Sequence, residues 1–260
     1  MHHSPNSSAT AQAVLCWDAE GAPYSPRFGD VYHSRSGALA QARTVFLAGC
    51  GLPQGWQGRA GHTILETGFG LGLNFLATWA AWRADPRRCA HLHFVSVEAY
   101  PVQAADIERA AHSLHAGDAH ETALRDAIAT AARELAGAWQ RIQPGLQTLA
   151  FDGGQVTLTL AVGEVLPMLA QLGGPVDAVY LDGFSPARNP AMWSAPTLAA
   201  VARLCRPGTR LASWCVAGAV RARLQELGFA VQRLDGLPPK RHRLQAVFTA
   251  GSAAASAPAQ

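Results

Sequence analysis

A strand that runs into an acid, three alternate glycines and a helix restricts the fold of this chain more than any other feature. Residues Ile64 to Asn74 read ILETGFGLGLN, and the apolar helical pattern continues to about Arg83. Alternate glycines let a backbone turn sharply and approach a ligand closely. The segment predicts a ligand-binding corner of an α/β sheet, and a tight strand-to-helix corner without a ligand is the plainer alternative.

The rest of the chain alternates between strand and helix patterns. Strands are expected at 62–66, 92–98, 155–162, 176–181, 210–215, 229–234 and 244–249, and helices at 73–83, 196–204 and 217–227, with helical periodicity over 102–141. Such alternation predicts an α/β fold with a Rossmann-like, doubly wound and mostly parallel sheet. The last two strands are joined by a turn, so we expect an antiparallel final strand.

Four acids follow four of the expected strands, at the ends where ligands bind in open α/β sheets. Glu66 precedes the first glycine by two residues, and an acid there would repel the pyrophosphate of a dinucleotide. S-adenosylmethionine has no phosphate, and a carboxylate suits its ammonium and sulfonium groups. Glu98 is placed to accept the ribose hydroxyls of an adenosine, Glu164 to meet the adenine edge, and Asp182 ends the fourth strand. We therefore predict that S-adenosylmethionine binds at Glu66, Glu98 and Glu164 and at Gly68, Gly70 and Gly72.

Charge and composition set weaker limits. A formal net charge of +3 permits a polyanionic partner without requiring one. Five cysteines without a Cys-x-x-Cys pair, and loosely spaced histidines, indicate neither a disulfide framework nor a metal site. No apolar run reaches membrane-spanning length and no signal peptide is expected, so we predict a cytoplasmic protein without a membrane partner.

Several blocks of this sequence resemble the MnmC-type tRNA methyltransferases. They read DVYHS at 30–34, ETGFGLGLNFL at 66–76, LHFVSVE at 92–98, LDGFSPARNPAMW at 181–193 and KR at 240–241. The block at 181–193 is the most specific, because it is long and unusual. The resemblance implies one class I methyltransferase domain over residues 13–250 with an N-terminal extension at 13–60, and we expect disordered ends at 1–12 and 251–260.

The resemblance also implies an activity. Enzymes of this kind methylate the amino group of 5-aminomethyl-2-thiouridine at the tRNA wobble position, so the anticodon loop would be the partner. In many relatives an FAD-dependent oxidase domain acts on the same base first. Asn74 would join the cofactor site, while Glu164 stands where the family usually has Asp. Acceptor contacts are implied for Tyr32, Phe184, Pro186, Lys240 and Arg241.

Asp182 is the candidate catalytic residue. A primary amine is largely protonated at neutral pH, and Asp182 is placed to orient it and to accept its proton. The turn Gly183-Phe184-Ser185-Pro186 follows, and Phe184 would stack on the base. Other interpretations stay open: Asp182 as a helix cap, a class I methyltransferase for a different amine, or a non-catalytic module that docks tRNA or an oxidase.

Overall fold

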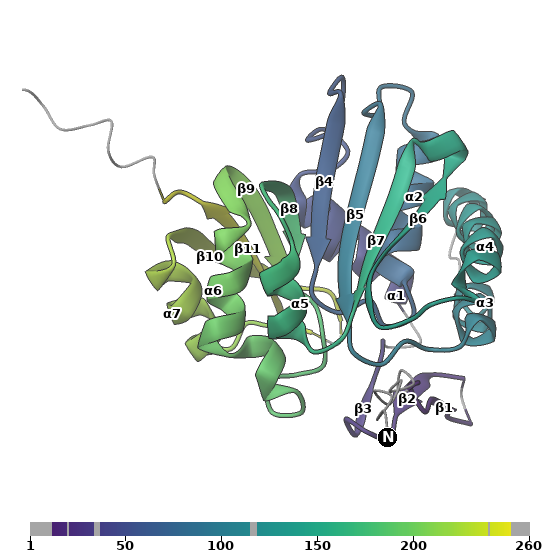
Figure 1. Cartoon of the computed structure of the whole chain (residues 1–260), viewed down its shortest axis with the longest axis horizontal. Helices are drawn as coiled ribbons and strands as arrows, with labels where there is room; N and C mark the ends of the chain where they lie inside the picture. The colour runs from purple at the N-terminus through teal and green to yellow at the C-terminus, as the bar shows by residue number, and fades with distance from the viewer. Residues whose placement is uncertain (1–11, 20, 34–36, 115–118, 239, 251–260) are drawn as a thin grey trace, which may run out of the picture.

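The computed structural model describes residues 12–19, 21–33, 37–114, 119–238 and 240–250. The ends for which we expected disorder lie outside these residues, apart from residue 12. The described chain is built around one large twisted sheet that has helices on both faces (Figure 1).

The large sheet has eight strands in the order β10-β11-β9-β8-β4-β5-β7-β6. The five strands from β9 to β7 pair in parallel, whereas β11 is antiparallel to both of its neighbours and β6 is antiparallel to β7. The predicted α/β fold and its antiparallel final strand are therefore confirmed. The strands are β4 (Gly61–Glu66), β5 (His91–Glu98), β6 (Gly145–Phe151), β7 (Val156–Val162), β8 (Val176–Tyr180), β9 (Cys205–Ser213), β10 (Phe229–Asp235) and β11 (His242–Phe248).

Two hydrophobic clusters pack on the two faces of the sheet. Ile64 belongs to one cluster and its neighbour Leu65 to the other, because successive residues of a strand point to opposite faces. The first cluster packs under α2 (Leu73–Ala84), α3 (Ala104–His112) and α4 (Ala119–Trp139), with α1 (Ala38–Gln41) and the short helical turns η1 (Ala42–Leu47) and η2 (Ala48–Cys50). The second packs under α5 (Val165–Gln171), α6 (Ala195–Arg203) and α7 (Gly218–Glu226). Two more short turns are η3 (Asp152–Gly154) and η4 (Pro190–Trp193).

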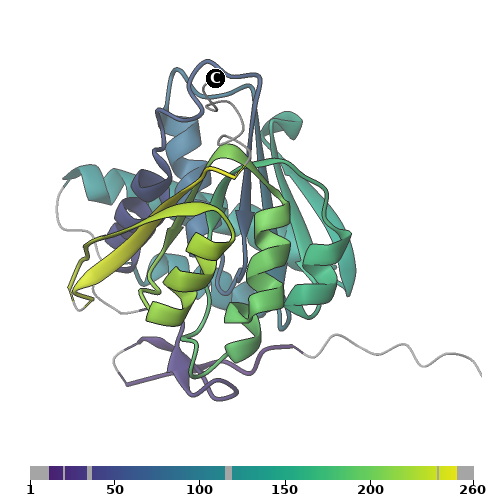
Figure 2. The same cartoon turned by 90° about the vertical axis from the view of Figure 1, so that its left-hand side faces the viewer.

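A small antiparallel sheet precedes the large one. It consists of β1 (Cys16–Trp17), β2 (Pro23–Ser25) and β3 (Asp30–Val31), in that order. Both views place it beyond the ends of the central strands of the large sheet, next to the loops that leave those strands (Figures 1 and 2). This position brings the N-terminal segment onto the face of the protein where the four predicted acids gather.

Besides the small sheet and α1, which were not predicted, and β9, which begins at Cys205 and not at 210, three elements differ from the sequence prediction. The helical pattern over 102–141 forms two helices, since α3 ends at His112 and α4 begins at Ala119. Strand β6 was not predicted; its residues alternate between exposed and half-buried positions at the edge of the sheet. Helix α5 was not predicted either, and its Pro167 lies in the first turn, where a missing backbone N–H has no cost.

Candidate active site

A cavity of about 700 Å³ opens at the carboxyl ends of β4, β5, β7 and β8, beneath the small N-terminal sheet. Residues that directly follow each of these strands form its floor, and residues 25–33 form part of its roof. All predicted site residues except Glu66 and Gly72 line it. They are Tyr32, Gly68, Gly70, Asn74, Glu98, Glu164, Asp182, Phe184, Pro186, Lys240 and Arg241.

The glycine turn uses its own N–H groups. The amide of Phe69 donates to Val97 O at 3.3 Å, that of Gly70 to the Glu98 carboxylate at 2.8 Å, and that of Gly72 to Phe69 O at 2.8 Å. A dinucleotide-binding turn instead directs such groups at a pyrophosphate. The turn therefore suits a ligand without phosphate, which is the property predicted for the cofactor.

Gly72 has a structural reason to be glycine. It begins α2 with φ +73°, and a Cβ at this position would lie 2.8 Å from the ring of Phe69. Gly70 also has a positive φ, of +53°, and its Cα faces the ring of Tyr32. The two glycines shape the turn, and only Gly70 reaches the cavity.

Glu98 is anchored by two backbone amides at the end of β5. Its Oε2 accepts from Gly70 N and its Oε1 from Tyr100 N, each at 2.8 Å. Burial raises the pKa of this carboxyl to about 6, although both hydrogen bonds favour the charged form. Each oxygen keeps a further acceptor site, so the fixed carboxylate can still receive hydroxyl donors from a ligand.

Glu66 lies behind the cavity wall. It is fully buried and accepts hydrogen bonds from Ser96 Oγ at 2.7 Å and from Asn74 Nδ2 at 3.0 Å. Burial raises the pKa of Glu66 well above its usual range, and the charge of Asp182 acts in the same direction. The direct ligand contact expected for Glu66 is therefore replaced by contacts within the protein, through Ser96 and Asn74.

Asp182, unlike Glu66, lines the cavity. Asn74 Nδ2 donates to its Oδ2 at 2.8 Å, and Gly183 N donates to its Oδ1 at 2.8 Å. Its backbone is fixed through Thr67, whose Oγ1 donates to Asp182 O at 2.7 Å and accepts from Asp182 N at 3.0 Å. Burial raises the pKa of Asp182, and the two donors and the nearby charge of Lys240 partly offset this rise.

Aromatic rings line the cavity near Asp182. The Phe184 ring stacks on Phe28 with 4.6 Å between centroids, and Tyr32 meets Phe184 edge-on at 5.0 Å. Tyr100 donates a long hydrogen bond of 3.4 Å to Glu164. Sequence reasoning missed Phe28 and Tyr100; Phe28 stands two residues before the DVYHS block, and Tyr100 stands two residues after Glu98.

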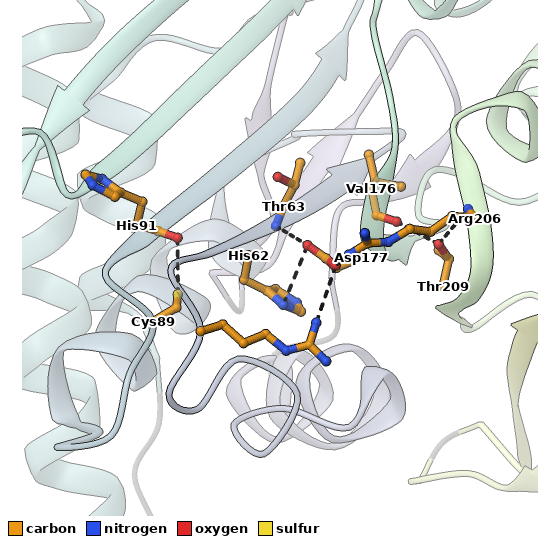
Figure 3. A network of polar contacts seen from close by, with 9 residues as sticks. His62, Thr63, Cys89, His91, Val176, Asp177, Arg206 and Thr209 are labelled. Atoms are coloured by element: carbon orange, nitrogen blue, oxygen red, sulfur yellow. Dashed lines mark hydrogen bonds and ion pairs between the residues drawn. The ribbon is translucent and has the colours of Figure 1, made fainter.

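A second polar cluster lies at the opposite, amino ends of the strands (Figure 3). Asp177 accepts from Thr63 N at 2.8 Å and from Arg206, and Arg59 lies 3.6 Å from it. His62 is buried beside it, with Nδ1 at 3.8 Å from Asp177 Oδ2, and burial lowers the pKa of His62 to about 4. These hydrogen bonds and ion pairs connect β4, β8 and β9, and they stabilise this end of the sheet.

No group of three or more His, Cys, Asp or Glu side chains in the described ranges is arranged to hold a metal ion. Within the same residues, no helix is both long enough and apolar enough to span a membrane.

Comparisons with known proteins show what this chain is similar to. A family model described as S-adenosyl-L-methionine-dependent methyltransferase matches residues 126–249. The "tRNA 5-methylaminomethyl-2-thiouridine biosynthesis bifunctional protein MnmC" of Acidovorax sp. (strain JS42) is 54% identical over 232 residues, which are 89% of this chain and 35% of that protein. The protein of the same name from Paracidovorax citrulli is 56% identical over 232 residues, with the same coverage. The chain thus spans about a third of the length of these curated relatives.

A solved structure shares the fold. The crystal structure of MNMC2 from Aquifex aeolicus superposes with a TM-score of 0.68 at 19% sequence identity, and the match covers 96% of this chain and 73% of that one. This likeness supports the fold alone, since the sequence identity is low.

Proposed function

We propose that this chain methylates a tRNA wobble base, as an S-adenosyl-L-methionine-dependent methyltransferase similar to the MnmC proteins. The proposed reaction converts the primary amine of 5-aminomethyl-2-thiouridine into the 5-methylaminomethyl form. The observation that carries the proposal is the Asp182 carboxylate, held at the cavity wall by Asn74 and Gly183.

The cavity fits the cofactor of this family. We propose that the backbone at Gly68 and Gly70 holds it together with the carboxylates of Glu98 and Glu164, and that Gly72 and Glu66 support these contacts from outside the cavity. The internally satisfied N–H groups of the turn favour a ligand without phosphate there. When bound, S-adenosylmethionine supplies a methyl group on a positively charged sulfur.

Asp182 prepares the acceptor. The amine enters largely as an ammonium, which donates hydrogen bonds well but has no lone pair with which to attack. The Asp182 carboxylate orients this group and accepts a proton from it, and the raised pKa of Asp182 makes it a better proton acceptor. Asn74 and Gly183 each occupy one oxygen and so fix the direction of the remaining lone pairs. Alignment of the two reactants by such contacts is worth on the order of 7–11 kcal/mol.

The acceptor base would lie among the aromatic rings and cations of the cavity. We propose that Phe184 stacks on the base, with Tyr32 and Pro186 beside it. Lys240 and Arg241 are exposed at the rim, where they suit the phosphates of an anticodon loop. Because the wobble base lies in a single-stranded loop, little base pairing is lost when it enters the site.

We also propose a partner enzyme, the bounds of the domain and a location for this chain. The relatives are named bifunctional, and we propose that an FAD-dependent oxidase, as a domain or a separate protein, acts on the same base. Residues 13–250 would work as one methyltransferase domain, with 13–60 as its N-terminal extension. A tRNA substrate fits a cytoplasmic location.

Mass analysis of wobble nucleosides tests the proposal. We expect tRNA carrying 5-aminomethyl-2-thiouridine to gain the mass of one CH₂ group at that base after incubation with the protein and S-adenosylmethionine. The matched control is the same tRNA with an unsubstituted 2-thiouridine, which offers no amine. Methylation of the control, or of neither tRNA, would contradict the proposed acceptor.

A further inference from the structure

Four aromatic side chains meet at one end of the cavity, and they come from three separate segments. Phe28 lies in the turn between β2 and β3, Tyr32 directly after β3, Tyr100 after β5 and Phe184 after β8. The rings form a row in which the Phe28 centroid lies 4.6 Å from that of Phe184, at an interplanar angle of 26°, and 6.1 Å from that of Tyr100, while Tyr32 contacts Phe184 on its other side.

Core packing does not account for Phe28 and Phe184. Both are half-buried and line the cavity, and neither belongs to either of the two hydrophobic clusters of the protein. Large aromatic rings gathered at a cavity wall are typical of a surface that binds a flat apolar partner. The geometry of the pair is that of stacked rings, which is also how aromatic side chains bind an unpaired base.

The two rings differ in how firmly the chain holds them. Phe184 follows the fixed backbone of Asp182, and its carbonyl accepts a 2.7 Å hydrogen bond from Trp193 Nε1. Phe28 stands on a turn between strands of three and two residues, closed by one hydrogen bond from Gly29 N to Ser25 O at 2.8 Å. The Phe28 side of the stack is therefore the side that can shift with less loss of structure.

We propose that Phe28 and Phe184 form a clamp for the ring of the methyl acceptor, a single-stranded nucleobase that stacks between them. The two rings are in contact, so entry of the base requires Phe28 to move away by about one ring thickness, ~3.5 Å. Phe184 is the fixed wall and Phe28 the adjustable one. This inference rests on the proposed function and adds a specificity residue, Phe28, that is supplied by the N-terminal extension.

The charges around the clamp fit a nucleic acid strand. The Arg27 guanidinium lies over the Tyr100 ring at 4.1 Å, and Arg188 lies near Gly29 on the other side of the turn. Lys240 and Arg241 line the same cavity and are exposed. Of the acids that line the cavity, Asp182 and Glu98 are held inside by backbone amides, Asp30 accepts from the next amide, Val31 N, and Glu164 accepts from Tyr100. The outer rim can thus contact phosphates while the clamp holds the base.

The test compares two RNA probes and matched variants. Binding of a fluorescent anticodon stem-loop with 5-aminomethyl-2-thiouridine at the wobble position is measured by anisotropy, beside the same stem-loop with an abasic wobble site. Base-to-aromatic stacking predicts that Phe28→Leu weakens binding of the complete probe about 5- to 150-fold and leaves the abasic probe unchanged. Phe28→Trp should restore the preference. Tyr24→Leu is the control, since Tyr24 is an exposed ring on the same small sheet that does not line the cavity.

The outcomes separate this inference from the proposed function. If the wild-type protein prefers the complete probe and Phe28→Leu keeps that preference, the clamp is wrong and the proposed acceptor stands. If the wild-type protein shows no preference between the probes, both are overturned. Calorimetry with S-adenosylmethionine is the folding control, and the cofactor should bind Phe28→Leu and the wild-type protein equally well. If Phe28→Leu does not bind the cofactor, the test depends on Phe28→Trp. That variant must still prefer the complete probe, or the clamp is rejected.

Discussion

The amide nitrogen of Asn74 lies 2.8 Å from the Asp182 carboxylate, although 108 residues separate the two in the chain. The same nitrogen donates to Glu66 at 3.0 Å, so both hydrogens of one amide bridge a buried acid and the acid of the cavity. Asn74 is the second residue of α2, which directly follows the glycine turn. The turn thereby connects the proposed cofactor contacts to the proposed proton acceptor.

Substitution of Asn74 tests this bridge. Asn74→Ala removes a donor that favours the charged form of Asp182, so the pKa of Asp182 should rise further and the acidic limb of the pH–rate profile should move to higher pH. Loss of a hydrogen bond to a charged group, about 1.5–3 kcal/mol, predicts a fall in single-turnover rate of about 10- to 100-fold. The control is Thr78→Val, one turn later on α2, which removes a buried hydrogen bond to Tyr180 and should leave the profile in place. An unshifted profile in Asn74→Ala would remove Asn74 from this role.

Two glycines have similar backbone angles but different surroundings, so substituting them separates steric crowding of a side chain from backbone strain. Gly72 and Gly58 have φ of +73° and +69°, but a Cβ meets the Phe69 ring at 2.8 Å at the first and nothing within 4 Å at the second. Gly58→Ala should lose about 1 kcal/mol of unfolding free energy for its left-handed backbone. Gly72→Ala should lose a further 1–3 kcal/mol, approximately, for overpacking. Urea unfolding of both variants gives the comparison, and equal losses would refute the crowding.

Glu98 should be needed for the cofactor. Glu98→Ala removes a carboxylate that two backbone amides hold in place, and we expect S-adenosylmethionine to bind more weakly by about 1–3 kcal/mol. Calorimetry measures the change, with circular dichroism to check the fold. An unchanged dissociation constant in a folded variant would exclude Glu98 from the cofactor site.

His62 should make stability depend on pH at the other end of the sheet. Its pKa is about 4 in the folded protein and about 6.5 when unfolded, so the unfolded chain binds more protons between these values. His62 therefore contributes fully to the free energy of unfolding above pH 6.5. This contribution, about 3 kcal/mol at most, is lost as the pH falls toward 4. Glu98 has a raised pKa of about 6, so it lowers the free energy of unfolding as the pH rises from 4.5 to 6, which opposes the effect of His62. The measurement is therefore the difference between wild type and His62→Leu, and a difference that does not vary between pH 7 and 4.5 would contradict it.

Much of the fold follows from local patterns in the sequence. Gly70 and Gly72 have positive φ, and a Cβ on Gly68 would lie 3.3 Å from Asp182 O. The buried strand at Val176–Tyr180 is apolar apart from Asp177 because helices cover both faces of the sheet. Strand β6 is less evident, since it lies at the sheet edge with alternating partial exposure. The small N-terminal sheet has strands of two or three residues, which are too short for a periodic signal.

The site was predictable in position but not in its connections. Glu66 and Asp182 each follow a strand, and this places them at one edge of the sheet. Which acid faces the cavity depends on contacts across the fold: Ser96 and Asn74 hydrogen-bond to Glu66 behind the wall, whereas Asp182 lies two residues beyond Tyr180, which pairs with Glu66. Phe28 reaches the cavity only because the extension folds back over it, a tertiary contact that no local pattern reports.

Asp182→Asn tests the central claim most directly, because it keeps the shape of the side chain and removes the base. The paired measurement is the dissociation constant of S-adenosylmethionine and the single-turnover rate of methylation of tRNA carrying the free aminomethyl group, at saturating cofactor. We expect nearly unchanged cofactor affinity and a rate lower by about 10²–10⁴-fold, the usual contribution of a general base. A variant with a near-normal rate at saturating cofactor would contradict the assignment of Asp182 as the group that orients the amine and accepts its proton.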